Sequence, residues 1–335
     1  MKKLLLLGAL FLLQACSSNQ DEIVAEPVET YPLYLTTMTH MEGDWKDDLN
    51  EDLFLRHVEQ LRYGMDLAEE YEAILTIESE KPFARANETW GVNIMREVLE
   101  RGHGVGTHCD LGWGKTTELK TAEAYSLEFI ENKELMDALV GTENNHGCSG
   151  GGSKNDWVTA ATLAGFDYIN GIVGMHVYGI EQKNRPNPEW DDKFIEKEAY
   201  HYNVPEDLED RIYLIKLKDL EDFEHDEDGT LVISSGELGR LDTLAEGSSD
   251  CLKTNCPLTS EDTDAFVAIV KEVNAYRDSN RIAKLNLYFP SNNFVEENED
   301  ALRYFFSEMQ KLQDEGLLEW ATQWELVETY LESLN

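Results

Sequence analysis

The 335-residue chain carries 67 acidic and 28 basic residues, which gives a net charge of −39. A field of that sign repels nucleic-acid backbones and anionic lipid headgroups, so we expect no nucleic-acid partner and no basic surface for docking on a membrane. The hydrophobic fraction of 41% is enough for a sizeable core.

The N-terminus has the features of an export signal. Lys2 and Lys3 precede an apolar run over residues 4–13, which is too short to span a bilayer but has the length of a signal-peptide core. The run ends in Leu-Gln-Ala-Cys, which resembles the lipobox of bacterial lipoproteins. We therefore expect residues 1–15 to be a signal peptide and Cys16 to carry lipid; the alternative is an ordinary secretory signal with a chance cysteine.

Residues 16–30 are polar and acidic with no apolar period, and we expect a flexible tether. The absence of Asp after Cys16 resembles sorting to the outer membrane. The expected location is thus the bacterial cell envelope, at the outer membrane or cell surface, with the membrane contacted through the lipid alone.

The remaining cysteines are even in number, which suggests disulfides in an exported chain. Cys251 and Cys256 bracket a short polar loop and are expected to pair, which leaves Cys109 with Cys148. Four cysteines allow three pairings, and the others stay open. A zinc site made of all four is less favoured, because no Cys-x-x-Cys spacing occurs.

From Tyr31 onward, apolar strand-like runs alternate with helical periodicity. Strands are predicted over residues 33–39, 73–77, 104–108, 166–170, 211–217, 230–234 and 283–289. Helices are predicted over residues 51–71, 87–101, 117–139, 154–164, 260–278, 296–313 and 323–334. This alternation predicts a parallel sheet wrapped by helices, as one α/β domain over residues 31–335 in the form of a single (β/α) barrel. Residues 171–210 and 219–229 are predicted to be long loops on its rim.

Two polar clusters follow predicted strands, where such barrels build their sites. In residues 39–45, His40 and Glu42 are two apart and face the same side of an extended backbone, and Asp44 follows. Imidazole and carboxylate together suit a divalent metal; a polar loop that caps the next helix is the alternative. In residues 101–110, His108 and Asp110 can point together into a site, whereas His103 suits a structural role at a helix-to-strand junction.

The run Gly-His-Gly-Val-Gly-Thr-His over residues 102–108 resembles the second motif of polysaccharide deacetylases, the NodB-homology family. The resemblance implies a seven-stranded barrel and His108 as a metal ligand. His-x-Glu-x-x-Trp over residues 40–45 stands where that family has its first motif, and it is similar to a metal motif of related α-mannosidases. By this resemblance His40 and Glu42 are ligands and Asp44 is a candidate base.

A third cluster, over residues 144–152, stands where the third deacetylase motif would fall and offers His146 as a further ligand; a structural loop histidine is the alternative. The sequence also departs from the family. Gly112 stands where a second histidine is expected, the first motif has no adjacent aspartates, and Phe289 lies near the place of the final-strand histidine. The sequence therefore supports the deacetylase fold better than it supports deacetylase activity.

Two other motifs are weaker. Gly147-x-Ser149-x-Gly151 fits the nucleophile elbow of serine hydrolases, but the residues before it are polar rather than strand-like. Residues 224–229 suggest a calcium loop, but its twelfth position is Ser235 instead of Glu, so a charged surface loop is the better interpretation.

We therefore predict a metal-dependent glycan deacetylase. His40, Glu42, His108 and His146 would hold a divalent ion, with zinc preferred, and Asp44 or Asp110 would transfer the proton. Predicted sugar-stacking residues are Trp45, Trp113 and Trp157. The alternatives are a non-catalytic glycan-binding lipoprotein and a glycosidase that uses two carboxylates, such as Glu42 and Glu237.

Overall fold

The structure is a computed structural model that describes residues 30–110, 117–245 and 257–334. The predicted signal peptide and tether, Cys16, Trp113, Cys251 and Cys256 lie outside the described residues, so those predictions stay untested. Among the described residues, no helix combines the length and the apolar character needed to cross a membrane.

In the part of the chain that the structure describes, ten strands form one sheet, in which every pairing is parallel except that of β6 with β7. Their bounds are β1 Leu33–Met41, β2 Thr76–Ser79, β3 Gly104–His108, β4 Gly147–Ser149, β5 Tyr168–Asn170, β6 Ile215–Leu217, β7 Leu231–Ser234, β8 Glu237–Arg240, β9 Ala283–Tyr288 and β10 Glu319–Trp320. The helices are α1 Glu51–Glu69, α2 Lys81–Thr89, α3 Ile94–Glu100, α5 Ala122–Val140, α6 Trp157–Leu163, α7 Asp192–Phe194, α8 Leu208–Arg211, α9 Ser260–Tyr276, α10 Glu299–Asp314 and α11 Gln323–Ser333.

The strand order is β6-β7-β5-β4-β3-β2-β1-β9-β8, with β10 beside β1. This hydrogen-bonded path is not itself a closed ring. Only Ser235 and Gly236 separate β7, which pairs with β5, from β8, which pairs with β9. If β7 and β8 are counted as one bent strand, they and β1, β2, β3, β4, β5 and β9 make seven parallel strands. The predicted α/β barrel architecture is confirmed.

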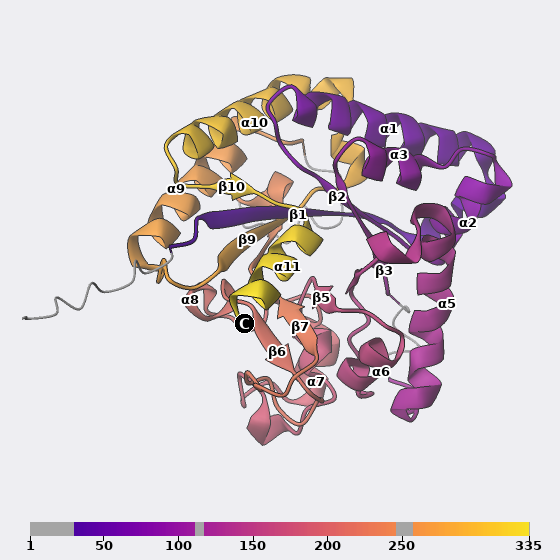
Figure 1. Cartoon of the computed structure of the whole chain (residues 1–335), viewed down its shortest axis with the longest axis vertical. Helices are drawn as coiled ribbons and strands as arrows, with labels where there is room; N and C mark the ends of the chain where they lie inside the picture. Colours follow the sequence, from indigo (N-terminus) through magenta and orange to yellow (C-terminus); the bar gives the residue numbers. More distant parts are fainter. Residues whose placement is uncertain (1–29, 111–116, 246–256, 335) are drawn as a thin grey trace, which may run out of the picture.

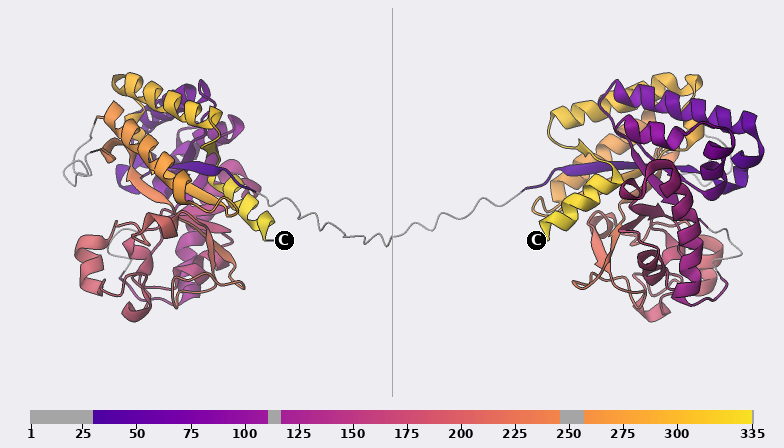
Figure 2. Two further views of the ribbon diagram at one scale, coloured as in Figure 1. Left: turned by 90° about the vertical axis from the view of Figure 1, so that its left-hand side faces the viewer. Right: turned by 45° about the vertical axis from the view of Figure 1, so that its right-hand side comes forward.

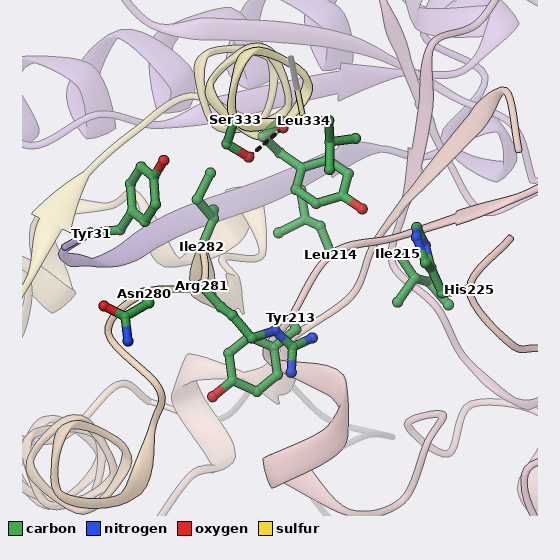
Figure 3. A pocket seen from close by; sticks show the side chains of 11 residues that line it. Tyr31, Tyr213, Leu214, Ile215, His225, Asn280, Arg281, Ile282, Ser333 and Leu334 are labelled. Carbon is green, nitrogen blue, oxygen red and sulfur yellow. Dashed lines mark hydrogen bonds between the residues drawn. The ribbon is translucent and has the colours of Figure 1, made fainter. Parts of the chain in front are cut away.

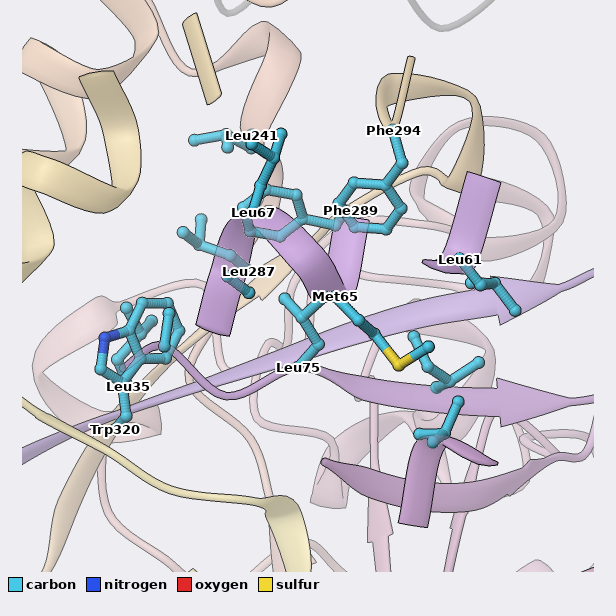
Figure 4. Close-up of a cluster of buried hydrophobic side chains, with 14 of the residues drawn as sticks. Leu35, Leu61, Met65, Leu67, Leu75, Leu241, Leu287, Phe289, Phe294 and Trp320 are labelled. Carbon is cyan, nitrogen blue, oxygen red and sulfur yellow. The ribbon is translucent and has the colours of Figure 1, made fainter. Parts of the chain in front are cut away.

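Helices cover the outside of the barrel, with α1, α3, α9 and α10 over one half and α5 and α6 over the other (Figures 1 and 2). Figure 4 shows the core between strands β1 and β9 and the helices that cover them. Leu35, Leu287 and Phe289 pack there with Leu61 and Met65 of α1. The side chains of alternate strand residues thus fill the space under the helices, and the other half of each strand faces the barrel interior.

Several predicted elements differ in the structure. Residues 171–210, predicted to be a long loop, contain the short helix α7 and most of the short helix α8, and the strand predicted over residues 211–217 is shortened to β6. The predicted helix over residues 87–101 is two helices, because Gly91 has a φ of +72° and the side chain of Asn93 accepts a hydrogen bond from Arg96 N to cap α3. Strands β4, β8 and β10 were not predicted. β4 is Gly-Cys-Ser and lacks the β-branched and aromatic residues that mark strands, and β8 contains Gly239 with a φ of +90°.

The barrel interior is unusually polar, since such barrels are normally filled by branched apolar side chains. Many polar residues on its strands and on α11 are no more than 1% exposed, among them Thr36, Glu78, Asn170, Ser234, Glu237, Lys284, Asn286 and Gln323. Gln323, the first residue of α11, accepts a hydrogen bond from Lys284 Nζ at 3.0 Å and donates one to Asn286 Oδ1 at 3.0 Å. A connected polar network therefore runs through the barrel.

Candidate metal centre

Three predicted ligands meet at the carboxyl ends of β1 and β3. His40, Glu42 and His108 each offer a ligand atom within 4.8 Å of the others. His108 Nε2 lies 3.6 Å from Glu42 Oε2, and His40 Nδ1 lies 3.8 Å from Glu42 Oε1. A tetrahedron of donors around zinc, with bonds of about 2.0–2.2 Å, has edges of roughly 3.3–3.6 Å. The three side chains therefore fit one small divalent ion after a minor closing movement.

The fold dictates this convergence. His40 is on β1 with its ring facing inward, Glu42 follows the strand on the same side, and His108 is the last residue of β3. The imidazole rings of His40 and His108 are stacked, with centroids 3.8 Å apart. The Tyr288 ring of β9 lies 4.9 Å from His40 and closes the other side. Side chains from three strands thus fix the site on the rigid part of the barrel.

A second group shares His108. Glu80, at the end of β2, and Asp110, after β3, lie within the same ligand distance of it, and Glu80 Oε1 is 3.8 Å from His108 Nε2. His108 Nδ1 is 2.8 Å from Ser149 Oγ, so only Nε2 is available to an ion. One nitrogen lone pair binds one ion, and the two groups therefore describe two sides of a single centre rather than two ions.

Electrostatics couple these groups strongly. Burial alone would lower the pKa of His108, but Glu42, Glu80 and Asp110 raise it to about 9. Burial alone would raise the pKa of Glu42, but its interactions with His108 and His40 lower it to about 2. Burial raises the pKa of Glu80 to about 7. Without an ion, His108 is thus a cation among carboxylates, and an incoming metal must displace its proton.

The structure removes His146 from the ligand set. His146 precedes β4 and so lies at the opposite end of the barrel from His108. Its Nδ1 is 2.8 Å from Asp167 Oδ2, its Nε2 is 2.8 Å from the Glu143 carbonyl, and its ring stacks on Trp324 at 3.6 Å. Both ring nitrogens are engaged, and the structural alternative for this histidine is the better one.

Two further predictions change. Trp157 is 0% exposed and its indole N–H donates to the His176 carbonyl at 2.8 Å, so it is a core residue and cannot stack on a sugar. Asp44 is exposed on a short helical turn and belongs to neither ligand group. Trp45 is half-buried, with its ring 4.6 Å from that of His57, and remains a candidate at the rim. Asp110 stays the better-placed candidate for proton transfer.

The Cys109–Cys148 disulfide is present, as predicted. It joins the residue after His108 to the residue before Ser149, so the covalent bond lies directly beside the His108–Ser149 hydrogen bond. The parallel pairing of β3 with β4 places His108 opposite Ser149 in the same register. Disulfide and register together hold the His108 ring in place.

Ser149 does not have the geometry of a nucleophile elbow. It is 0% exposed, and within the described chain the only non-glycine residues with positive φ are Lys46 and Glu72. The elbow needs an exposed serine on a strained turn. Ser149 is instead placed to accept the proton of His108 Nδ1, so that Nε2 is the nitrogen whose proton an incoming ion would displace.

The glycine turn after Ser149 rests on His176. A Cβ on Gly152 would come within 2.8 Å of the His176 backbone. His176 Nδ1 accepts from Val173 N at 3.1 Å, and its Nε2 lies 3.1 Å from the Gly150 carbonyl. These contacts need the neutral ring with its proton on Nε2, and burial lowers the pKa of His176 to about 4.

Acidification is therefore expected to destabilise the fold through His176. Its pKa is about 4 when folded and about 6.5 when unfolded, so between these values the unfolded chain binds more protons and stability falls as pH falls. This contribution should reach roughly 2–3 kcal/mol by pH 4.5. Urea unfolding of the wild type and of His176→Gln at pH 7.5 and 4.5 measures it. An equal acid sensitivity in both proteins would contradict the assignment.

A recess of about 390 Å³ lies away from this centre, between Tyr31, Tyr213, Arg281 and the end of α11 (Figure 3). The guanidinium of Arg281 lies over the Tyr213 ring at 3.7 Å. None of the predicted site residues lines it. The recess is therefore separate from the candidate metal centre.

Comparison of the sequence with models of known protein families finds no match, and comparison with curated proteins finds none either. The structure is similar to the crystal structure of a candidate polysaccharide deacetylase from Mycobacterium smegmatis, at a TM-score of 0.54 and 12% identity over 91% of this chain and 92% of that chain. It is also similar to PuuE allantoinase, at a TM-score of 0.56 and 9% identity over 89% and 90%. The chain thus has the deacetylase-type barrel fold.

Proposed function

We propose that this protein is a metal-dependent hydrolase that removes acetyl groups from a glycan. The observation that carries the proposal is the convergence of His40, Glu42 and His108 within 4.8 Å at the end of the barrel where such folds place their chemistry. The residues 102–108 motif points to the same activity from the sequence. The two similar structures carry the names of different hydrolases, so the choice of an acetylated glycan rests on the motif.

His40, Glu42 and His108 would hold the ion, and zinc suits this mixture of imidazole and carboxylate. When bound, such an ion polarises a carbonyl and makes water more acidic. The chain itself supplies the remaining groups. Ser149 orients His108, and Glu80 and Asp110 are placed beside His108 Nε2 to take a proton from water and return it to the leaving group. Glu80 was missed in the sequence because β2 was predicted to end at residue 77.

The glycosidase alternative loses its second carboxylate. Glu237 is 1% exposed and its Oε1 accepts from Gly171 N at 2.8 Å inside the barrel. A retaining or inverting glycosidase needs both carboxylates at the substrate. The non-catalytic glycan binder remains the main competitor, since the deacetylase motifs are incomplete.

We further propose that the protein is anchored at the bacterial cell envelope by a lipid on Cys16. Tyr31, two residues before β1, and the candidate centre are at opposite ends of that strand. A nine-residue strand spans roughly 30 Å. A lipid tether that joins the barrel before Tyr31 would therefore attach at the end of the barrel far from the centre and leave the centre accessible to extracellular glycan. Metabolic labelling with a palmitate analogue tests the lipid, and it should disappear in Cys16→Ser.

Acetate release tests the activity. Zinc-loaded protein is expected to release acetate from acetylated chito- and xylo-oligosaccharides. Glu42→Gln is expected to lower the rate by more than ~100-fold, because loss of an outer-sphere partner alone costs about 10–100-fold and Glu42 would bind the ion directly. Asp44→Asn, the exposed neighbour, is the matched control and should keep its rate. Binding of the oligosaccharides without acetate release at any metal loading would favour the non-catalytic binder instead.

A further inference from the structure

A buried carboxylate lies directly beneath the candidate centre. Glu78 is on β2, where it pairs in register with His40 of β1 on one side and Gly106 of β3 on the other. Its side chain is 0% exposed. A Cβ on Gly106 would come 3.2 Å from Glu78 Cγ, so the glycine provides the space that the Glu78 side chain occupies.

Glu78 contacts one nitrogen of His40. His40 Nε2 lies 3.1 Å from Glu78 Oε2, while His40 Nδ1 faces Glu42 Oε1 at 3.8 Å. Neither Nε2 nor either oxygen of Glu78 has a regular hydrogen bond among the described residues, although all three atoms are buried. Buried polar atoms without partners are costly. A proton on His40 Nε2 can therefore be shared with Glu78 Oε2, which lies 3.1 Å away.

A buried lysine of the barrel interior lies near Glu78. Lys284 is fully buried in the same barrel interior and interacts electrostatically with both Glu78 and Glu237. Its Nζ donates to Gln323 Oε1 at 3.0 Å. A buried carboxylate with no cation nearby would be neutralised or expelled. Lys284 thus places a cationic side chain in the barrel interior on the side of Glu78 away from His40.

We infer that Glu78 is a positioning residue that holds the proton of His40 on Nε2 and so presents the Nδ1 lone pair toward Glu42 and the ion. The inference rests on the proposed metal centre. Carboxylates in the outer sphere commonly fix the tautomer and orientation of a ligating histidine. His108 has the mirror arrangement, with Nδ1 anchored on Ser149 and Nε2 toward the ion. The two histidines would therefore bind through different ring nitrogens.

Zinc titration of Glu78→Gln tests the inference. The amide is the same size but carries no charge and can turn its NH₂ toward His40, so zinc affinity should fall by about 10–100-fold. Glu237→Gln is the matched control, because Glu237 is an equally buried carboxylate near Lys284 that makes no contact with a histidine in the described structure. The zinc affinity of Glu237→Gln should stay within about 2-fold of the wild type, which is well below the loss expected for Glu78→Gln. Equal affinities in Glu78→Gln and wild type would overturn the inference.

A spectroscopic readout separates this inference from the proposed function. In protein labelled with ¹⁵N-histidine, long-range ¹H–¹⁵N correlations report which nitrogen of each of the eight histidines carries the proton. His40, assigned by its loss in His40→Gln, should be protonated on Nε2 in metal-free wild type. A neutral Nδ1–H form would overturn the role of Glu78. If the wild type fails to bind zinc, the proposed function fails, but the His40 tautomer still decides the role of Glu78.

Discussion

Replacing His108 with asparagine is expected to abolish stoichiometric zinc binding and acetate release together. His108 belongs to both ligand groups, and its Nε2 is the one nitrogen that faces Glu42, at 3.6 Å, and Glu80, at 3.8 Å. Loss of an outer-sphere partner typically lowers metal affinity by about 10–100-fold, so loss of the ligand itself should exceed ~100-fold. Isothermal titration with zinc, followed by metal analysis of desalted protein, measures the loss.

His146→Asn is the control for that substitution. His146 carries the same chemistry but is held by Asp167 and Trp324 at the far end of the barrel. Its replacement should leave zinc stoichiometry unchanged. If His146→Asn loses zinc and His108→Asn keeps it, the centre lies at the opposite end of the barrel.

Removing the Cys109–Cys148 disulfide should lower the free energy of unfolding by about 4 kcal/mol. The bond closes a loop with a sequence separation of 39, and the entropy that such a cross-link removes from the unfolded chain gives that value. The double variant Cys109→Ser/Cys148→Ser avoids a lone thiol, and urea denaturation measures the change. The variant should also bind zinc more weakly, because the disulfide flanks the His108–Ser149 pair.

Two comparisons make that result interpretable. Wild type unfolded in the presence of a strong reductant should lose the same stability as the double variant. Ser149→Ala, which keeps the disulfide, should weaken zinc binding while preserving most of the stability. A double variant with unchanged unfolding free energy would contradict the assigned role of the bond.

The sequence alone predicted the barrel because its period is strong: apolar strands and amphipathic helices alternate along the chain, and only parallel α/β folds bury such a pattern. It located His40, Glu42 and His108 because each stands at or just past the end of a strand with recognisable composition.

The wrong choice of His146 as a ligand has one cause, which is the unpredicted strand β4. Gly-Cys-Ser does not resemble a strand, so nothing showed that His146 stands before a strand and Ser149 at its end. Because β4 separates His146 from the end of the barrel that holds the candidate centre, His146 was wrongly predicted to be a ligand. Trp157 failed for a different reason: sequence cannot distinguish a buried aromatic ring from one that stacks on a ligand, because both need the same residue type.

Anomalous diffraction at the zinc edge, from crystals of the wild type grown with zinc, tests the central claim most directly. We expect one strong peak, bonded at about 2.0–2.2 Å to His40 Nδ1, His108 Nε2 and a Glu42 oxygen. A peak elsewhere, or bonding through His40 Nε2, or no peak at saturating zinc, would contradict it.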